Sequence, residues 1–416
     1  MLKKIQWREP QGVQTSFLFA GDFCPREENS DYVAENAEKI TANIKSVFDD
    51  ADYRILQWET AVTEGGYPIV KDGPNLRCKA SCLKFSKSLN CDIHLLANNH
   101  VGDYGPDAVI ETIEHHKSAN IMTVGAGKNL EDACKPLFFD TPSGRTAIIN
   151  IAENEFGIAS ENSAGVAPLD PFENIQQIKK VRQEADILIV AIHGGHEHNP
   201  FPSPRMTKTY RAFAEAGADI VFNCHTHCMG GTELYNNVPV IYSPGNFYFP
   251  MRVGGAVGWQ FGYLTKFYCD NKGCFAYEII PYTFDFDNIR LLDDEEFERV
   301  NRHYHEICDI IQDSGKLKKL FDAWCCGNAG HCYLAAVNRT HEAEYPPVWS
   351  DDEIIRRWIN VKNTFNCESH ADLLRNYLYI ISMKKVDEAK QYTPLLEKYC
   401  KFEYMQDLLA QRKSSF

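Results

Sequence analysis

The chain has 416 residues, of which 44% are hydrophobic and 24% are charged, and its formal net charge is -14. This composition supports a sizeable buried core, spread over two or three domains or over one large domain with a smaller partner. The acidity argues against a nucleic-acid-binding protein, because phosphate binding needs a basic surface. We see no apolar run long enough for a signal peptide or a membrane span. We therefore expect a cytoplasmic protein without a membrane anchor, whose 15 cysteines are reduced thiols.

Short apolar runs alternate with amphipathic segments over the first two-thirds of the chain. The runs are rich in Val, Ile, Leu and Phe and are bounded by turn residues, as strands are. We predict strands at Ser16–Ala20, Tyr53–Gln57, Ile93–Ala97, Ala147–Ile151, Ile187–Ile192, Ile220–Asn223 and Val238–Tyr242. The helices predicted between them are Tyr32–Phe48, Pro106–His116, Pro171–Glu184 and Thr207–Ala216. This alternation indicates an α/β core with helices covering a central sheet.

The last third of the chain has a different pattern. Gly262–Tyr268 and Phe275–Pro281 flank a Cys-Asp-Asn-Lys-Gly loop, which predicts an antiparallel hairpin that closes the core near Tyr282. From about Leu292 onward the pattern is helical, and Asp293-Asp294-Glu295-Glu296 is a favourable helix start. The predicted helices are Glu295–Gln312, Asp351–Asn360, Ala371–Met383 and Asp387–Tyr399. We therefore expect a core domain over residues 1–285 and a helical region over residues 286–416.

One cysteine-rich segment lies within this helical region. Cys325, Cys326, His331 and Cys332 occur together in WCCGNAGHC. Their spacing matches no standard zinc pattern, so we interpret them as buried thiols at a helix end. A structural metal site is the alternative interpretation.

Five of the predicted strands are followed by polar side chains that can bind a metal ion. The carboxyl ends of the strands line one edge of an open α/β sheet, where ligands bind. We therefore expect these side chains to converge although they are far apart in the sequence. They are Asp22, Glu59, Asn98-Asn99-His100, His193 and His225-Thr226-His227.

The residue types also suit a metal site. Histidine nitrogen combined with Asp, Glu and Asn oxygen is a mixed donor set for Mn, Fe, Zn or a similar divalent ion. A pair of such ions can share a bridging carboxylate, for which Glu59 is a suitable residue, and can activate a water molecule. His225 and His227 would lie on the same side of an extended chain and could reach two neighbouring ions.

Each signal alone has an ordinary explanation. A Gly-Asp pair after a strand is usually a turn, and Asn98-Asn99 suits a loop with left-handed backbone. His193 before two glycines could be a loop histidine with satisfied hydrogen bonds, and a His-x-His sequence also occurs by chance. The prediction of a metal or catalytic site depends on all five signals occurring at equivalent strand ends.

Six sequence blocks, taken in order, are similar to a known family. They are Phe19-Ala-Gly-Asp22, Trp58-Glu59-Thr60, Ala97-Asn-Asn-His100-Val-Gly-Asp103-Tyr-Gly105, His193-Gly-Gly-His-Glu197, Gly217-Ala-Asp-Ile-Val-Phe-Asn-Cys-His225-Thr-His227 and Tyr242-Ser-Pro-Gly-Asn246-Phe. They resemble the CapA family, the bacterial capsule or poly-gamma-glutamate synthesis family, which is similar to the calcineurin-like metallophosphoesterases. The resemblance covers roughly Ser16 to Tyr282, and the tail with Cys367-Glu-Ser-His370 also resembles tails of the family.

The resemblance implies a four-layer αββα sandwich of metallophosphoesterase type with a C-terminal helical extension. It also implies a metal site with Asp22 and His227 on a first ion, Glu59 as the bridge, and Asn99, His193 and His225 on a second ion. His100 would be a general acid or transition-state stabiliser near the leaving oxygen, and Asp103 would orient it. Glu197 and Asn246 would line the site.

Three positions depart from the metallophosphoesterase pattern. Cys24, which would line the site, stands where the usual first motif has a histidine, although CapA-like sequences share that loss. A buried neutral thiol is the commoner state of such a cysteine, although a thiolate can bind zinc or iron. Cys224 replaces the usual glycine before His-x-His, and Glu59 replaces the usual bridging aspartate. We therefore expect the site to bind either one or two metal ions.

Three functions compete at this stage. The first is metal-dependent hydrolysis of a small or polymeric anionic substrate, most simply a phosphate ester, with an amide or another polymer bond as a variant. The second is a capsule or exopolymer assembly factor whose site binds a polyanionic chain or a partner without turnover. The third is a structural or interaction protein with a relict site, which the intact set of histidines and asparagine disfavours.

Overall fold

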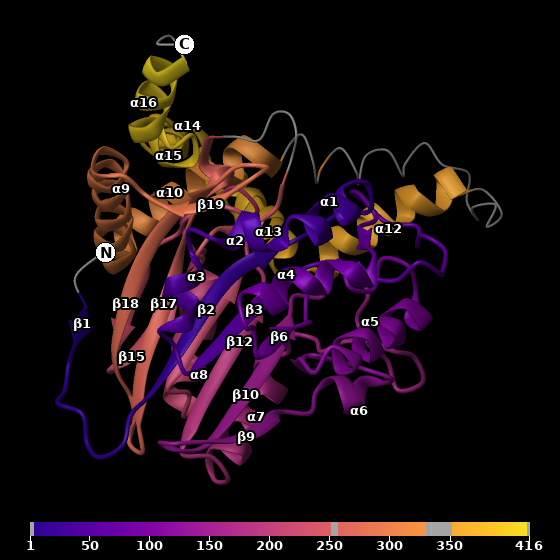
Figure 1. The fold of residues 1–416 in the computed structure, drawn as a ribbon. Helices are drawn as coiled ribbons and strands as arrows, with labels where there is room; N and C mark the ends of the chain where they lie inside the picture. Colours follow the sequence, from indigo (N-terminus) through magenta and orange to yellow (C-terminus); the bar gives the residue numbers. More distant parts are fainter. Residues whose placement is uncertain (1–3, 251–256, 330–333, 335–351, 414–416) are drawn as a thin grey trace.

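Two stacked β-sheets form the centre of the protein (Figure 1), whose computed structural model describes residues 4–250, 257–329, 334 and 352–413. The first sheet has the strand order β1 (Ile5–Gln6), β18 (Gly273–Phe284), β17 (Phe261–Asp270), β2 (Thr15–Phe23), β3 (Tyr53–Trp58), β6 (Ile93–Leu95) and β7 (Met122–Val124). Two more strands join it, β16 (Asn246–Tyr248) beside β2 and β19 (Ile289–Leu291) beside β18. The second sheet has the order β14 (Thr232–Tyr235), β15 (Val238–Ile241), β13 (Ile220–Cys224), β12 (Ile187–His193), β10 (Gly144–Ala152) and β9 (Leu137–Thr141).

The central strands of both sheets are parallel. In the first sheet β2, β3, β6 and β7 pair in parallel, and in the second sheet β10, β12, β13 and β15 do the same. Each of the seven strands predicted from the sequence forms, with bounds shifted by a few residues. The predicted hairpin is also confirmed, because β17 and β18 pair antiparallel. Parallel pairing brings the carboxyl ends of these strands to one edge of each sheet, as the sequence predicts.

The inner faces of the two sheets pack against each other in a shared hydrophobic core. Phe19 of β2 meets Phe222 of β13 with ring centroids 4.7 Å apart, and Ile55 and Ile189 belong to the same buried cluster. Both faces of these strands are covered, which explains why β12 and β13 read as continuous apolar runs rather than alternating ones.

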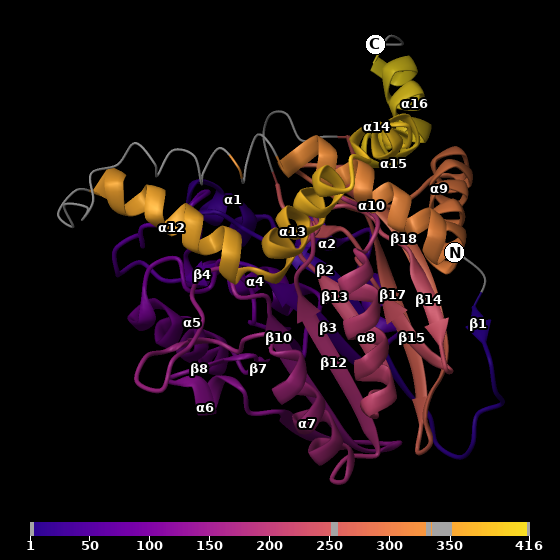
Figure 2. The same ribbon diagram turned by 180° about the vertical axis from the view of Figure 1, so that it is seen from behind.

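Helices cover both outer faces. On the first sheet lie α1 (Ser30–Glu35), α2 (Ala37–Thr41), α3 (Lys45–Asp49) and α4 (Leu83–Ser88). On the second sheet lie α7 (Pro171–Arg182) and α8 (Pro204–Ala216), which are seen in front of it in Figure 2. This part also contains helix α5 (Pro106–Ser118) and the short helix α6 (Leu130–Ala133). Two small two-stranded sheets complete it: β4 (Ala61–Val62) pairs with β5 (Arg77–Cys78), and β8 (Ala126–Gly127) pairs with β11 (Gly165–Val166). The expected α/β fold with four αββα layers is therefore confirmed.

The prediction of one helix over Tyr32–Phe48 is wrong, because that segment forms three short helices. Asn36 leaves the helical conformation, with φ -107° and ψ 12°, and its side-chain amide donates to the carbonyl of Tyr32 at 2.9 Å. An asparagine side chain that bonds to the local backbone competes with helix propagation. A turn over residues 42–44 separates α2 from α3.

The C-terminal third is helical, as predicted. It comprises α9 (Asp294–Gln312), α10 (Ser314–Asn328), α12 (Asp352–Asn366), α13 (Glu368–Ser382), α14 (Val386–Lys390), α15 (Thr393–Cys400) and α16 (Glu403–Lys413). The acidic start of α9 forms a capping box, in which Asp293 Oδ1 accepts from the backbone N–H of Glu296 at 2.9 Å. The single helix predicted over Asp387–Tyr399 is wrong: it is divided into α14 and α15, and Pro394, which cannot continue a preceding helix, stands in the first turn of α15.

These helices share the hydrophobic cores of the sheets. Val300 and Tyr304 of α9 belong to the core between the sheets, and Leu320 of α10 belongs to the core outside the second sheet. Cys325 is buried in α10 and accepts a hydrogen bond from Asn376 at 3.3 Å, whereas His331 and Cys332 lie outside the described residues. The division of the chain near residue 285 stays a prediction.

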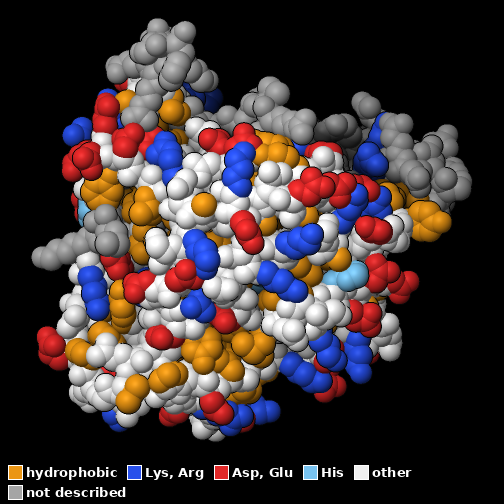
Figure 3. Space-filling model, in the orientation of Figure 1, with side chains coloured by type: hydrophobic (Ala, Val, Ile, Leu, Met, Phe, Trp, Pro, Cys, Tyr) orange, Lys and Arg blue, Asp and Glu red, His pale blue; other side chains and the backbone are white. Residues whose placement is uncertain are grey.

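Two surface properties bear on the expected partners. Within the described segments, no helix combines the length and the apolar character needed to cross a bilayer. On the face drawn in Figure 3, acidic and basic side chains are interspersed. Some of them form exposed ion pairs, such as Lys79 with Asp31 at 2.7 Å.

The inter-sheet core generates a prediction about stability. Phe222→Ala, at a fully buried position, should lower the free energy of unfolding by about 3–5 kcal/mol, because a cavity replaces the ring. Phe172→Ala is the matched control, since that ring is 83% exposed, and it should change the free energy by less than about 0.5 kcal/mol. Urea denaturation of both variants measures the difference, and equal losses would contradict the assignment of Phe222 to the core.

Candidate metal centre

The site lies where the carboxyl edges of the two sheets meet. Asp22 is the penultimate residue of β2, and Glu59 directly follows β3, where its N–H donates to the carbonyl of Phe23 at 2.9 Å. In the second sheet His193 ends β12 beside Cys224 of β13, and His225 follows directly. The backbone N–H of His225 donates to Asp22 Oδ2 at 3.1 Å, which joins the two edges.

Six of the predicted ligands are brought together there. His193 Nε2 lies 3.1 Å from Asn99 Oδ1, 3.1 Å from His225 Nδ1 and 3.3 Å from Glu59 Oε1. Glu59 Oε1 also lies 3.6 Å from His227 Nε2, and Asp22 Oδ1 lies 3.7 Å from His193 Nδ1. Adjacent ligand atoms about 2.0–2.2 Å from a common ion are separated by about 2.8–3.6 Å in octahedral or tetrahedral geometry. The three separations from His193 Nε2 match those between ligands of one ion, whereas Asp22 faces the other nitrogen of that ring.

The hydrogen bonds of these buried groups are incomplete. Among the described residues, Asp22 Oδ1, both carboxylate oxygens of Glu59 and His193 Nδ1 are buried without a hydrogen-bond partner. Burying such groups unpaired is costly. A single proton on His193 Nε2 also cannot satisfy Asn99, His225 and Glu59 together. The residues present therefore fit one or two divalent cations, which would pair with the free carboxylate oxygens of Asp22 and Glu59 and bind one ring nitrogen of His193.

Burial and nearby charges shift the pKa values of the side chains in the site. Burial, followed by the nearby charge of Glu59, raises the pKa of Asp22 well above its ordinary value. Burial lowers the pKa of His193, which favours the neutral imidazole that binds metals. Burial opposes protonation of His225 as well, but surrounding carboxylates, Glu197 first among them, outweigh burial and raise its pKa. Glu197 itself is exposed.

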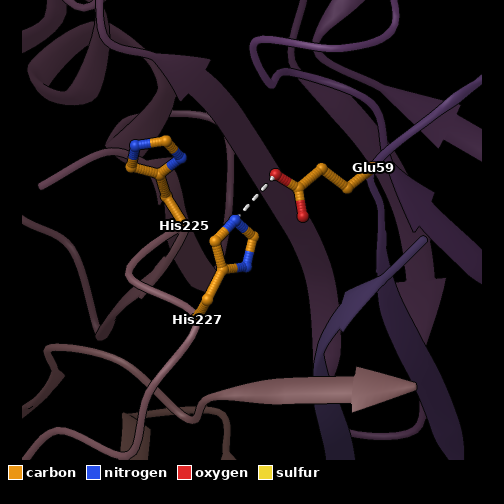
Figure 4. A group of neighbouring side chains, drawn as sticks. All are labelled: Glu59, His225 and His227. Carbon is orange, nitrogen blue, oxygen red and sulfur yellow. Dashed lines mark ion pairs between the residues drawn. The ribbon is translucent and has the colours of Figure 1, made fainter. Parts of the chain in front are cut away.

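Figure 4 shows that Glu59 points toward His225 and His227, with ligand atoms that lie within 4.8 Å of one another. The expectation that His225 and His227 lie on an extended chain is wrong. Both residues have left-handed backbone, with φ 102° at His225 and φ 54° at His227. Such a conformation costs about 1–3 kcal/mol per non-glycine residue, and strain of this kind clusters at functional sites. The turn carries both imidazoles into the space beside Glu59.

Asn246 fixes the orientation of His227. Its Oδ1 lies 2.8 Å from His227 Nδ1, which leaves Nε2 of the same ring directed toward Glu59. Asn246 begins β16 and stands beside Asp22 in the first sheet. A group that binds the second ring nitrogen of a metal-ligating histidine sets its tautomer. Asn246 therefore lines the site by orienting a candidate ligand rather than by contributing a donor of its own.

Cys24 has an apolar environment. Its side chain is fully buried in a cluster with Leu76 and Phe249, and Trp259 packs against that cluster. Burial raises the pKa of the thiol well above its ordinary value. The position therefore holds a neutral thiol, and the part of the site around Asp22 and His227 has one donor fewer than the standard pattern.

His100 and Asp103 form a buried pair, as the sequence predicts. His100 Nδ1 lies 2.7 Å from Asp103 Oδ2, and the backbone N–H groups of His100 and Val101 donate to Asn98 Oδ1. Lys71 also contacts this pair, at 2.6 Å from Asp103 Oδ1, and sequence reasoning missed it. The loop that carries Lys71 has no motif that could have indicated it.

A second residue missed from the sequence, Glu153, joins the C-terminal helices to the site. Glu153 directly follows β10, so its place after a strand was a usable signal. Its N–H donates to the carbonyl of His193 at 3.0 Å, and a Cβ on Gly194 would lie 2.5 Å from its Cγ. Its carboxylate accepts from Arg205 at 2.5 Å and from the N–H of Ser369, at the start of α13, at 3.0 Å.

This buried ion pair generates a prediction about stability and pH. Burial would raise the pKa of Glu153, but Arg205 and then Ser369 outweigh burial and lower it to about 2. Arg205→Met leaves the carboxylate uncompensated and should lower the free energy of unfolding by about 3–5 kcal/mol at pH 7. Because the pKa of Glu153 is lower in the folded state, this contribution is complete above its ordinary value of 4.5. The deficit of the variant should therefore shrink as the pH falls from there toward 2.

Lys45→Met is the matched control, because Lys45 forms an exposed pair with Asp49 at 2.6 Å. Its effect should be too small to measure in the same experiment, since water screens such a pair. Chemical denaturation at several pH values measures both variants. A loss in Arg205→Met no larger than that in Lys45→Met would contradict the importance of the pair.

Comparison with known proteins agrees with the blocks found in the sequence. The model of the family described as "Bacterial capsule synthesis protein PGA_cap" matches residues 16–251, which is more than half of the chain. The chain is 29% identical over 255 residues to the PGA biosynthesis protein CapA of Bacillus subtilis (strain 168), a match covering 59% of this chain and 65% of the relative. It is 27% identical over 277 residues to the capsule biosynthesis protein CapA of Bacillus anthracis, covering 64% of this chain and 61% of that protein. The matched part thus spans less than two-thirds of either relative.

Among solved structures, a 5'-nucleotidase precursor from Thermus thermophilus aligns with 14% identity and a TM-score of 0.40, covering 67% of this chain and 55% of that one. The matched family segment begins in β2 and includes the strand ends that carry Asp22, Glu59, Asn99, His193, His225 and His227. The chain belongs to the bacterial capsule synthesis protein PGA_cap family.

Proposed function

We propose that the protein is a metal-dependent hydrolase of metallophosphoesterase type that acts on an anionic substrate in capsule or exopolymer biosynthesis. One observation carries the proposal: six donor side chains from both sheet edges converge with separations of 3.1–3.7 Å, and three of the four carboxylate oxygens of Asp22 and Glu59 lack a hydrogen-bond partner within the described part of the chain. Membership of the capsule synthesis family supports the biological setting. A phosphate ester is the simplest substrate, and a polymeric substrate is the alternative within the same chemistry.

The donor atoms suggest two unequal positions for Mn, Fe, Zn or a similar ion. Asn99, His193 and His225 with Glu59 provide four donors, whereas Asp22 and His227 with Glu59 provide three. Glu59 is common to both sets, as a bridging carboxylate would be. The apolar surroundings of Cys24 add no charged donor to the second set. We therefore expect the first position to bind more tightly, with one ion at low metal concentration and two at high concentration.

The chemistry follows from the residues around these positions. A bound divalent ion would lower the pKa of a water molecule and withdraw charge from the bond to be cleaved. Hydrolysis of a phosphate ester transfers the hydroxyl of water to phosphorus, while the electron pair of the broken bond stays on the departing oxygen. His100 is the residue that delivers a proton to this oxygen, since Asp103 occupies its Nδ1 and leaves Nε2 for the substrate.

A second candidate is a polymer-binding or assembly factor with a partial metal site and without turnover. The names of the two Bacillus relatives refer to biosynthesis rather than hydrolysis, which favours this alternative. The two functions differ in a measurable way. A hydrolase turns over an ester in the presence of its metal, whereas an assembly factor binds the metal and an anionic chain without releasing product.

Two single substitutions test the proposal. His225→Ala and Asn99→Ala each remove a donor from the four-donor set, so metal content should fall from about one or two ions per chain toward none or one. Turnover of a generic aryl phosphate should fall by about 100-fold or more, because bound metal supplies much of the rate. Elemental analysis of protein purified without chelator and a steady-state assay measure the two effects.

His305→Ala is the control, because His305 lies on α9 and contacts the ring of Tyr304 rather than the six donors. It should keep the metal content and the rate of the unsubstituted protein. Full metal content and rate in both His225→Ala and Asn99→Ala would contradict the ligand assignment. Normal metal binding by the unsubstituted protein, with no hydrolysis of phosphate or other esters, would favour the assembly factor.

A further inference from the structure

A buried lysine stands behind the His100–Asp103 pair. Lys71 belongs to the loop between β4 and β5 and is only 4% exposed, with its ammonium group 5.1 Å from the ring centroid of Phe156. The backbone of the same loop is attached to Asp103. Ile69 N–H donates to the carbonyl of Asp103 at 2.9 Å, and Leu76 N–H donates to its Oδ2 at 2.7 Å.

The ammonium group of Lys71 contacts three groups of the site. It lies 2.6 Å from Asp103 Oδ1, 3.3 Å from His100 Nδ1 and 3.4 Å from the carbonyl oxygen of Asn99. A lysine so deeply buried is stable only when its charge is paired. The short contact with Asp103 provides that pairing. Both side chains of this salt bridge have almost no access to water.

The distances decide where the proton of His100 resides. An ammonium group can only donate, so a hydrogen bond from Lys71 to His100 Nδ1 would require that nitrogen to be unprotonated. An unprotonated Nδ1 would then face the carboxylate oxygen of Asp103 at 2.7 Å, lone pair against lone pair. The contact of 2.7 Å outweighs the contact of 3.3 Å, so Nδ1 carries the proton and donates it to Asp103 Oδ2.

The two oxygens of Asp103 consequently have separate tasks. Oδ1 is held by Lys71, and Oδ2 accepts from both Leu76 N–H and His100 Nδ1. Without Lys71, Oδ1 would lose its bond and the carboxylate could turn about its Cβ–Cγ bond. The orientation of the imidazole, and therefore of Nε2, depends on that carboxylate.

We propose that Lys71 is a positioning residue for His100, acting through Asp103 to hold the Nδ1 proton and direct Nε2 at the departing group. The predicted effect of Lys71 on catalysis rests on the proposed hydrolytic function. Its predicted effect on the Nδ1 proton of His100 does not. Lys71 also balances the charge of Asp103 in a site that already contains Asp22 and Glu59, which reduces repulsion of an anionic substrate.

The predicted effect of Lys71 on the His100 Nδ1 proton can be tested without metal or substrate. In the metal-free protein, the ring proton on His100 Nδ1 should give a downfield, slowly exchanging ¹H–¹⁵N resonance, assigned by its absence in His100→Gln. In Lys71→Met this resonance should be lost or exchange at least ten times faster. Lys79→Met is the control, because Lys79 pairs with Asp31 on the surface, and it should leave the resonance unchanged. An unchanged resonance in Lys71→Met, or none in the unsubstituted protein, would overturn the inference.

The kinetic consequence is tested by comparing leaving groups. Lys71→Met should lower kcat about 10–100-fold for an alkyl phosphate, whose leaving oxygen needs a proton, and less than threefold for an activated aryl phosphate. KM should change little, since Lys71 acts on His100 rather than on the substrate. Equal losses for both substrates would contradict a role through His100.

A double-mutant cycle covers the case in which Lys71→Met folds poorly because it leaves Asp103 unpaired. Lys71→Met introduced together with Asp103→Asn leaves no unpaired charge, and it should have the same alkyl-to-aryl ratio as Asp103→Asn alone. An additional loss in the double variant would overturn action through Asp103. If the unsubstituted protein hydrolyses no phosphate ester, the proposed function fails, while the resonance of the Nδ1 proton still decides the role of Lys71.

Discussion

Two buried carboxylates set the constraint on which the rest of the site depends. Asp22 and Glu59 have no solvent exposure, and three of their four oxygens lack a hydrogen-bond partner among the described residues. Neighbouring anions in a desolvated site repel each other unless a cation compensates them. Parallel pairing of β2 and β3 in the first sheet nevertheless brings them together, because Asp22 lies near the end of β2 and Glu59 directly follows β3. In our proposal a bound metal ion compensates the negative charges of the two carboxylates, and the fold already holds both carboxylates in place to bind it.

The histidines are held in place by elements on opposite sides of the site. Asn246 of β16 binds the ring of His227 from the first sheet, and Glu153 after β10 supports the backbone of His193 within the second. Glu153 in turn is bonded to Ser369 at the start of α13. The turn at His225 and His227 has unfavourable backbone conformations, which persist only where the surroundings determine them. The supporting contacts therefore explain how a strained turn can present two imidazoles with a defined geometry.

Much of this arrangement could be predicted from the sequence, for a physical reason. Parallel strands place their carboxyl ends on one edge of a sheet. The convergence of five side chains could therefore be predicted from their positions at the ends of apolar runs: Asp22, Glu59, Asn99, His193 and His225. The remaining features depend on contacts that no period in the sequence records. Asn36 divides a helix through a side-chain bond to Tyr32, and the left-handed backbone of His225 accompanies a long-range hydrogen bond from its N–H to Asp22. Lys71 was missed because its loop has no regular pattern, whereas Glu153 follows a strand and could have been included.

The asymmetry that we propose between the two metal positions follows from Cys24. A neutral thiol packed against Leu76 and Phe249 cannot replace an imidazole as a donor, so the half with Asp22 and His227 relies on Glu59 for its third ligand. The other half has four donors, and it is also the half whose backbone is tied to Glu153 and to the loop of Lys71 through Asn99. The better-supported half is thus the one next to His100, the residue proposed to act on the leaving group. In our proposal, such an arrangement would hold the metal position next to His100 fixed even if an ion in the three-donor half exchanged.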